Sequence, residues 1–233
     1  MSANTISYKK PLLETPFHEK TREKCYAHDW YRWAGYKAVN QYTSAELEYT
    51  SMRNTAGVID ISPMHKYSVK GKDAKKFINK LITRDITDIQ PHQVVYGIWC
   101  NEDGFVIDDG TVFCFDENNF RICSGERNLN WFEDTAIGYD VKIEDVSHSI
   151  AALAFQGPLS CKILHMLNAN NIEKLKPFYF DQFTIQANPS SNGVRILFGL
   201  KACSAAIRSA FTTINPASTL TISKAFNPAA KIL

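Results

Sequence analysis

The residues with the clearest chemical potential are Asp108 and Asp109, two adjacent carboxylates inside an otherwise apolar run from Phe105 to Phe115. Side chains alternate between the two faces of a β-strand, so each carboxylate lies among apolar neighbours on its own face. An ionised carboxylate there is costly unless it is hydrogen-bonded, paired with a cation or in contact with a polar ligand. Two interpretations are open. In the first, one Asp lies at a sheet rim and the other accepts hydrogen bonds from a neighbouring loop, with a bulge at Gly110 as a variant; in the second, one member of the pair is functional.

A hairpin is expected to position this pair. The composition of Asn101–Gly104 is typical of a turn, and a second apolar run ends just before it at Trp99 and Cys100. One face of the second strand then carries Asp109 together with Phe105, Ile107, Thr111, Phe113 and Phe115. The opposite face carries Asp108 together with Val106, Gly110, Val112 and Cys114.

The surrounding pattern predicts an α+β domain, in which a mixed β-sheet has helices on one face. Between His65 and Phe155 the expected order is strand, helix, three strands, helix and two strands. Three helix starts are predicted from capping residues. They are Thr15 with Pro16, Thr43 with Glu46 in a capping box, and Asp73 before an amphipathic helix. A further helix is expected after Pro158, and a last strand within residues 175–185.

An aromatic cluster precedes the sheet. It consists of Trp30, Tyr31, Trp33, Tyr36 and Tyr42. Such a cluster serves either as core and loop packing or as one wall of a pocket for a flat ligand.

Composition limits the class of protein. The chain has 233 residues, 45% of them hydrophobic, and a net charge of +2, which gives no reason to expect binding to nucleic acid or to an anionic membrane. No apolar window is long enough to span a bilayer, and residues 1–10 lack the features of a secretory or mitochondrial address. The six cysteines are scattered, which indicates reduced thiols in a cytoplasmic protein and no metal site. The oligomeric state stays open.

The end of the chain differs from the rest. Residues 182–233 contain no Asp or Glu, and Ala, Ser, Thr and Asn dominate there. This segment is either a basic, Ala-rich terminal helix and loop or a sequence of different origin.

Six short segments occur in a characteristic order along the chain. They are Trp33–Tyr36, Arg53–Met64, Ile82–Asp85, Tyr96, Gly104–Asp109 and Ala154–Pro158. The fifth reads Gly-Phe-Val-Ile-Asp-Asp, and the last contains a Gln-Gly-Pro turn. From Thr15 to about Ile185 the chain thereby resembles the N-terminal part of the glycine-cleavage T-protein family, the tetrahydrofolate-dependent aminomethyltransferases.

This resemblance implies a T-protein folate-binding fold with a ferredoxin-like subdomain. It implies tetrahydrofolate as the cofactor and Asp109 as the catalytic residue that faces it, with Met64, Tyr96 and Phe113 completing the folate site. The implied reaction moves a one-carbon unit onto N5 of tetrahydrofolate, from a small donor or from a lipoylated carrier protein. Aromatic rings on the Asp109 face would then bracket a pterin or aminobenzoyl ring.

The chain also departs from the family pattern. Pro63 replaces the usual His, and Gly110-Thr111 follows Asp109 where an aliphatic pair is common. An Arg-Thr-Gly segment expected soon after Ile185, and the C-terminal barrel, are missing. We therefore expect a truncated folate-binding domain over residues 1–185 and a divergent, possibly frameshifted tail over residues 186–233. The candidate functions are one-carbon transfer by an incomplete copy, a non-catalytic folate-binding remnant, and an interaction module.

Overall fold

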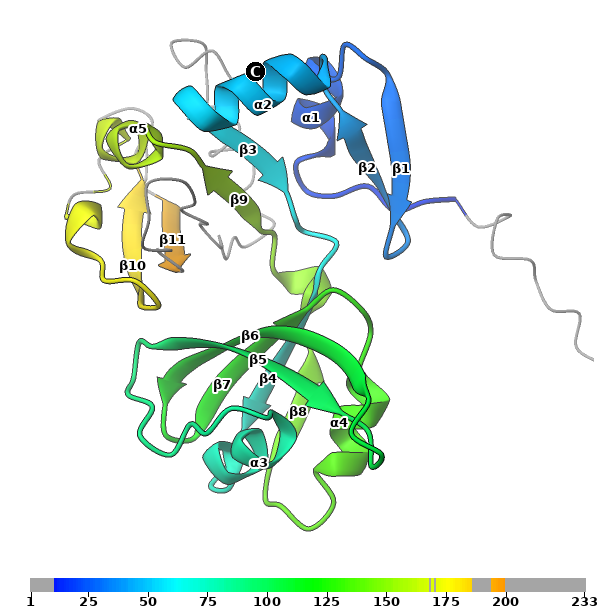
Figure 1. The fold of residues 1–233 in the computed structure, drawn as a ribbon, viewed down its shortest axis with the longest axis vertical. Helices are drawn as coiled ribbons and strands as arrows, with labels where there is room; N and C mark the ends of the chain where they lie inside the picture. The colour runs from blue at the N-terminus through cyan, green and yellow to red at the C-terminus, as the bar shows by residue number, and fades with distance from the viewer. Residues whose placement is uncertain (1–10, 168, 170, 186–193, 200–233) are drawn as a thin grey trace, which may run out of the picture.

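The computed structural model describes residues 11–167, 169, 171–185 and 194–199. Five α-helices and eleven strands are assigned within these residues (Figure 1). The helices are α1 (His18–Lys24), α2 (Ala45–Asn54), α3 (Ala74–Leu81), α4 (Leu129–Thr135) and α5 (Ser160–Met166). The strands are β1 (Asp29–Trp33), β2 (Tyr36–Gln41), β3 (Gly57–Asp60), β4 (His65–Lys70), β5 (Val94–Cys100), β6 (Val106–Asp116), β7 (Asn119–Ser124), β8 (Lys142–Asp145), β9 (Leu153–Gln156), β10 (Phe180–Ile185) and β11 (Val194–Gly199).

The largest sheet has the strand order β5-β6-β7-β4-β8, with α3 and α4 on one face (Figure 1). The predicted fold class is therefore confirmed, and no closed barrel occurs among the described residues. One detail differs from the expectation of a mixed sheet, because all neighbouring strands here are antiparallel. Each pair except β4–β7 and β4–β8 is joined by a hairpin, and hairpin connections impose antiparallel pairing.

The face covered by the helices forms the main core. Phe77 and Ile78 of α3 and Phe132 of α4 are fully buried there against Tyr67 of β4 and Ile122 of β7. The apolar residues of α3 recur at helical spacing, and those of β4 and β7 recur at every second position, as the sequence pattern indicates. This face of the sheet is the helix face.

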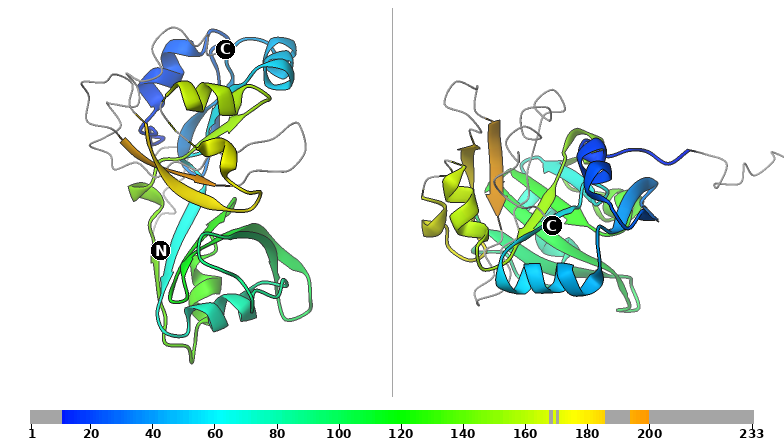
Figure 2. Two further views of the ribbon diagram at one scale, coloured as in Figure 1. Left: turned by 90° about the vertical axis from the view of Figure 1, so that its left-hand side faces the viewer. Right: turned by 90° about the horizontal axis from the view of Figure 1, so that it is seen from above.

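The opposite face of the same sheet, which carries Asp109, is the open face. The remaining described elements lie on this side (Figures 1 and 2). The antiparallel pair β3–β9 leads away from the sheet toward the hairpins β1–β2 and β10–β11 and the helices α1, α2 and α5. The aromatic cluster of residues 30–42 forms the hairpin β1–β2, with its turn at Ala34 and Gly35, both at positive φ.

The predicted caps of α1 and α2 are wrong, and the predicted cap of α3 is correct in position but makes no capping hydrogen bond. The Thr15 hydroxyl donates a hydrogen bond to Asp60 at 2.5 Å instead of capping α1, which begins three residues later. Ser44, not Thr43, caps α2 by accepting from the amide of Leu47 at 3.3 Å. Asp73 is the N-cap residue of α3, as predicted, but its carboxylate accepts from the amide of Asp140 at 3.1 Å and makes no capping hydrogen bond. Thr15 and Asp73 bond to groups that are distant in sequence, and the cap of α2 is shifted by one residue. Local spacing reveals neither outcome.

Two further observations concern predicted boundaries. β11 lies beyond residue 185 and pairs with β10 along its whole length. The remainder of the predicted tail, residues 186–193 and 200–233, lies outside the described residues. In the part of the chain that the structure describes, no helix is long and apolar enough to cross a membrane.

Candidate functional site

Asp109 lies near the turn end of the open face, opposite Ile98 of β5. Tyr96 of β5, two residues before Ile98, lies on the same face as Asp109. The Tyr96 hydroxyl donates a short hydrogen bond to Oδ2 of Asp109. This bond raises the pKa of Tyr96, because the phenol must stay protonated to donate. The sequence-predicted pair is therefore brought together.

The site is accessible at its aromatic side. Tyr96 is 49% exposed, and Asp109 is partly buried. Beyond it, toward the turn, Phe105 is 71% exposed. A carboxylate oriented by one hydrogen bond, with an aromatic ring beside it, can accept N–H donors from a flat heterocycle.

Asp108 has a structural role on the helix face. Its Oδ2 accepts from the Asn128 side chain at 2.7 Å and from the Glu126 amide at 3.1 Å. Its Oδ1 accepts from the Asp109 amide at 2.8 Å. These bonds fix the loop before α4, whose first residues follow Asn128. Asp108 thus accepts hydrogen bonds from a neighbouring loop, as the structural interpretation expects, whereas Asp109 faces the accessible side.

One interpretation of the sequence placed a bulge at Gly110, but the bulge of the hairpin lies elsewhere. The pairing shifts where Trp99 lies opposite Asp108 and Cys100 lies opposite Val106, so the extra residue is Ile107. Gly110 has a different requirement. A Cβ atom on it would lie 2.3 Å from the carbonyl oxygen of Cys123 on β7, so only glycine allows this close strand approach.

The next row of the open face contains Thr111 and Cys123, which lie opposite each other on β6 and β7. The buried Thr111 hydroxyl makes no hydrogen bond of full geometry within the part of the chain that the structure describes, although it lies close enough to the Cys123 thiol to act on the pKa of that group. Burial raises the pKa of the Cys123 thiol, so that this group is neutral near pH 7. A hydroxyl without a full hydrogen bond two residues from Asp109 fits a site that is completed by a polar ligand.

Met64 lies at the same end of the sheet as Asp109. It directly precedes His65, which pairs with Ser124, and Ser124 in turn pairs with Gly110. Met64 is half-buried and packs against a small cluster that contains Trp33 and Ile61. The predicted site residue Met64 therefore lies at the same edge of the sheet as Asp109, two strands away from it.

Lys66 is a site-proximal residue that sequence reasoning missed. It is 1% exposed, and its Nζ donates to the carbonyl oxygens of Ser62 and Met64, both at 2.8 Å. Burial lowers its pKa to about 8. Lys66 thereby holds the turn that presents Met64. Alternation along residues 65–70 could have placed it on the open face, but a lysine at such a position is ordinarily read as exposed.

Phe113 shares the open face with Asp109 but is 1% exposed. Its ring meets that of Phe180 on β10 edge to face, with centroids 5.4 Å apart. Phe180 also contacts Phe115 at 5.0 Å. The exposed ring beside Asp109 is therefore that of Tyr96. Phe113 is covered by Phe180 and packs beneath it.

The sequence matches the family model described as the GCVT N-terminal domain over residues 20–193. The chain belongs to this family. The aminomethyltransferase of Clostridium botulinum (strain 657 / Type Ba4) is 40% identical over 149 residues, which cover 62% of this chain and 40% of the relative. That of Caldanaerobacter subterraneus subsp. tengcongensis is 38% identical over 151 residues, which cover 63% and 40%. The chain thus spans about 40% of the length of the curated relatives it matches.

A solved relative shows the same fold. The glycine cleavage system aminomethyltransferase T from Bartonella henselae superposes with a TM-score of 0.66 at 22% identity. The match covers 75% of this chain and 50% of that one. The family membership supports one-carbon transfer as the general class of function.

Proposed function

We propose that this chain binds tetrahydrofolate at Asp109 and acts in aminomethyl or methyl transfer to it. The observation that carries this proposal is the oriented, accessible carboxylate of Asp109, held by Tyr96 beside the unsatisfied Thr111 hydroxyl. Family membership and the aminomethyltransferase relatives supply the reaction class. When bound, tetrahydrofolate supplies N5 as the acceptor of the one-carbon unit.

Asp109 has two roles in this proposal. It accepts hydrogen bonds from the N–H groups of the pterin ring and so fixes its orientation. It also stabilises positive charge that develops near the reacting nitrogen, as a preoriented carboxylate does without reorganisation. Tyr96 is a positioning residue, because its hydroxyl holds one carboxylate oxygen and leaves the other free to accept. The one-carbon donor is a small molecule or the aminomethyl group of a lipoylated carrier protein.

The test is a calorimetric titration of tetrahydrofolate into the purified chain and three variants. Asp109→Asn keeps the shape but removes the charge, and we expect binding to weaken at least tenfold, about 1.4 kcal/mol. Tyr96→Phe should weaken it less. Asp103→Asn, an exposed carboxylate in the preceding turn, is the matched control and should bind as the parent does. Equal binding by Asp109→Asn and the parent would overturn the proposed site.

A non-catalytic folate-binding module is the second candidate. A turnover assay with an aminomethylated lipoyl donor and tetrahydrofolate, monitored by release of ammonia, separates the two. Binding with release of ammonia supports transfer, and binding without it supports the module. Absence of folate binding would leave an interaction domain.

A further inference from the structure

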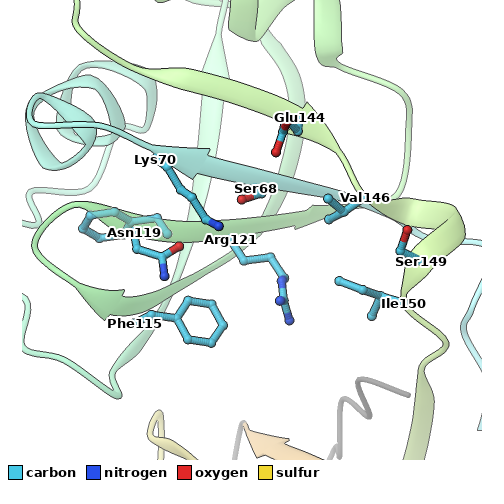
Figure 3. A pocket seen from close by; sticks show the side chains of 10 residues that line it. Ser68, Lys70, Phe115, Asn119, Arg121, Glu144, Val146, Ser149 and Ile150 are labelled. Atoms are coloured by element: carbon cyan, nitrogen blue, oxygen red, sulfur yellow. The ribbon is translucent and has the colours of Figure 1, made fainter. Parts of the chain in front are cut away.

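A hollow lies on the open face, at the end of the sheet away from Asp109. Its volume is about 280 Å³, and its walls come from β4, β6, β7, β8 and the segment 146–150 (Figure 3). The side chains with hydrogen-bonding groups in its lining include Ser68, Lys70, Asn119, Arg121, Glu144 and Ser149. A hollow lined by polar and apolar groups together is unlike the wholly apolar packing on the helix face.

Strand pairing explains why these groups converge. Ser68 of β4 lies opposite both Arg121 of β7 and Glu144 of β8, and Lys70 lies opposite Asn119. Figure 3 shows Lys70 and Arg121 reaching from neighbouring strands into the same space, with Phe115 on one side and Ile150 on the other. Two cations thus share one hollow.

The charge balance favours an anion. The carboxylate of Glu144 is bound by Nζ of Lys142 at 2.5 Å, so its charge is partly compensated. The guanidinium carbon of Arg121 lies 5.0 Å from the centre of the Phe115 ring, which supports the group from one side. Burial lowers the pKa of Arg121, which means that its charge is partly removed from water. A partly desolvated guanidinium binds an anion more strongly than an exposed one, and its planar fork matches a carboxylate.

We propose that this hollow binds a carboxylate group, with Arg121 and Lys70 as the charged partners and Ser68 and Asn119 as neutral donors. Glu144 on the same wall disfavours a doubly charged phosphate, so a monoanion fits better. Two sources of the carboxylate share this chemistry. One is the glutamyl tail of tetrahydrofolate, which depends on the function proposed above, and the other is a separate small carboxylic acid, such as an amino acid that donates the one-carbon unit.

The geometry allows both sources. Arg121 pairs with Phe113, four residues along β6 from Asp109, which is about 13 Å at ~3.3 Å per residue. A ligand with a ring at one end and a carboxylate at the other can span such a separation. Phe180 covers Phe113 between the two ends, so a spanning ligand must pass beside its ring.

The direct test does not require folate binding. Glutarate and p-aminobenzoylglutamate are titrated into the full chain, with uncharged p-aminobenzamide as the ligand control, while the Nε–Hε signal of Arg121 is followed by NMR. We expect a saturable shift with both acids, its loss in Arg121→Gln and its partial retention in Arg121→Lys. Arg22→Gln, an exposed arginine of α1, is the matched control and should keep the response.

If Arg121→Gln does not fold by its thermal transition, Lys70→Gln on the adjacent strand replaces it and should weaken the binding of both acids several-fold. No saturable shift of Arg121 in the parent, or equal affinity in parent and folded variants, overturns the carboxylate site.

A second pair of ligands identifies the source. Tetrahydropteroate lacks the glutamyl tail, so a tail bound at Arg121 predicts roughly tenfold tighter binding of tetrahydrofolate in the parent, and no difference in Arg121→Gln. A separate carboxylic acid predicts equal binding of the two pterins and simultaneous binding of glutarate. If neither pterin binds, the proposed folate function fails, while the glutarate titration still decides the carboxylate site.

Discussion

The two faces of the five-stranded sheet are built from the same strands but from different kinds of residue. On the helix face, Tyr67, Ile122 and Phe132 are fully buried in one apolar cluster. On the open face, the same strands present Lys66, Thr111 and Arg121 at neighbouring positions. Residues on the first face are explained by packing alone, whereas the second face carries polar groups, among them the buried Thr111 hydroxyl, which meets no full hydrogen-bond partner among the described residues. Stability and function are therefore expected to separate by face.

The largest effect is expected on the helix face. Phe132→Ala removes a ring that meets Tyr67 at 5.1 Å and Trp99 at 5.3 Å, both edge to face. We expect the free energy of unfolding to fall by about 3–5 kcal/mol, as for other fully buried aromatic residues. Urea unfolding monitored by circular dichroism measures it. A loss below about 1 kcal/mol would mean that this face is not the main core.

Lys66→Met tests a buried charge on the open face. In the parent, the folded-state pKa of about 8 lies below the ordinary value of 10.5, so the unfolded chain binds more protons between these values. The penalty for burying the charge is therefore fully present below pH 8 and is relieved as pH rises toward 10.5. The shift corresponds to about 3 kcal/mol.

The measurement compares the free energy of unfolding of parent and Lys66→Met between pH 7 and pH 9.5. The advantage of the variant over the parent should be greatest at pH 7 and should shrink as pH rises. The lost bonds to Ser62 and Met64 add a constant difference that does not depend on pH. Parallel curves would show that Lys66 keeps an ordinary pKa in the folded chain.

The adjacent carboxylates give the sharpest contrast between faces. Asp108→Asn places an amide donor where two donors, from Asn128 and Glu126, now meet an oxygen. We expect a loss of about 1–3 kcal/mol in the free energy of unfolding. Asp109→Asn should change it by less than about 0.5 kcal/mol, because its carboxylate is bonded to the exposed Tyr96. Equal losses in the two variants would contradict the division of roles between them.

The sequence predicted the helix face well, because apolar residues recur there at the spacing of helices and strands. It also placed Asp109, Thr111 and Phe113 on one face of a hairpin strand, and the structure agrees. It did not reveal that Phe180 covers Phe113, since that contact joins residues 67 positions apart. Nor did it identify Lys66 as buried, because a lysine in an alternating strand is ordinarily exposed, although the carbonyl groups that satisfy it belong to Ser62 and Met64 in the turn just before β4. Local spacing predicts periodic packing, but not which polar groups meet across the fold.

The smallest effect on stability is expected for Thr111→Val, which is also the finest probe of the open face. Valine has a similar shape but lacks the hydroxyl, which is buried without a hydrogen-bond partner in the described part of the chain. Removing an unsatisfied polar group should leave the free energy of unfolding unchanged or raise it by up to about 1 kcal/mol. If the hydroxyl instead serves a bound folate, Thr111→Val should weaken tetrahydrofolate binding several-fold while stability holds. A variant that loses stability without ligand would show that the Thr111 hydroxyl is hydrogen-bonded within the protein. The open face would then need no ligand at this position, as the helix face needs none.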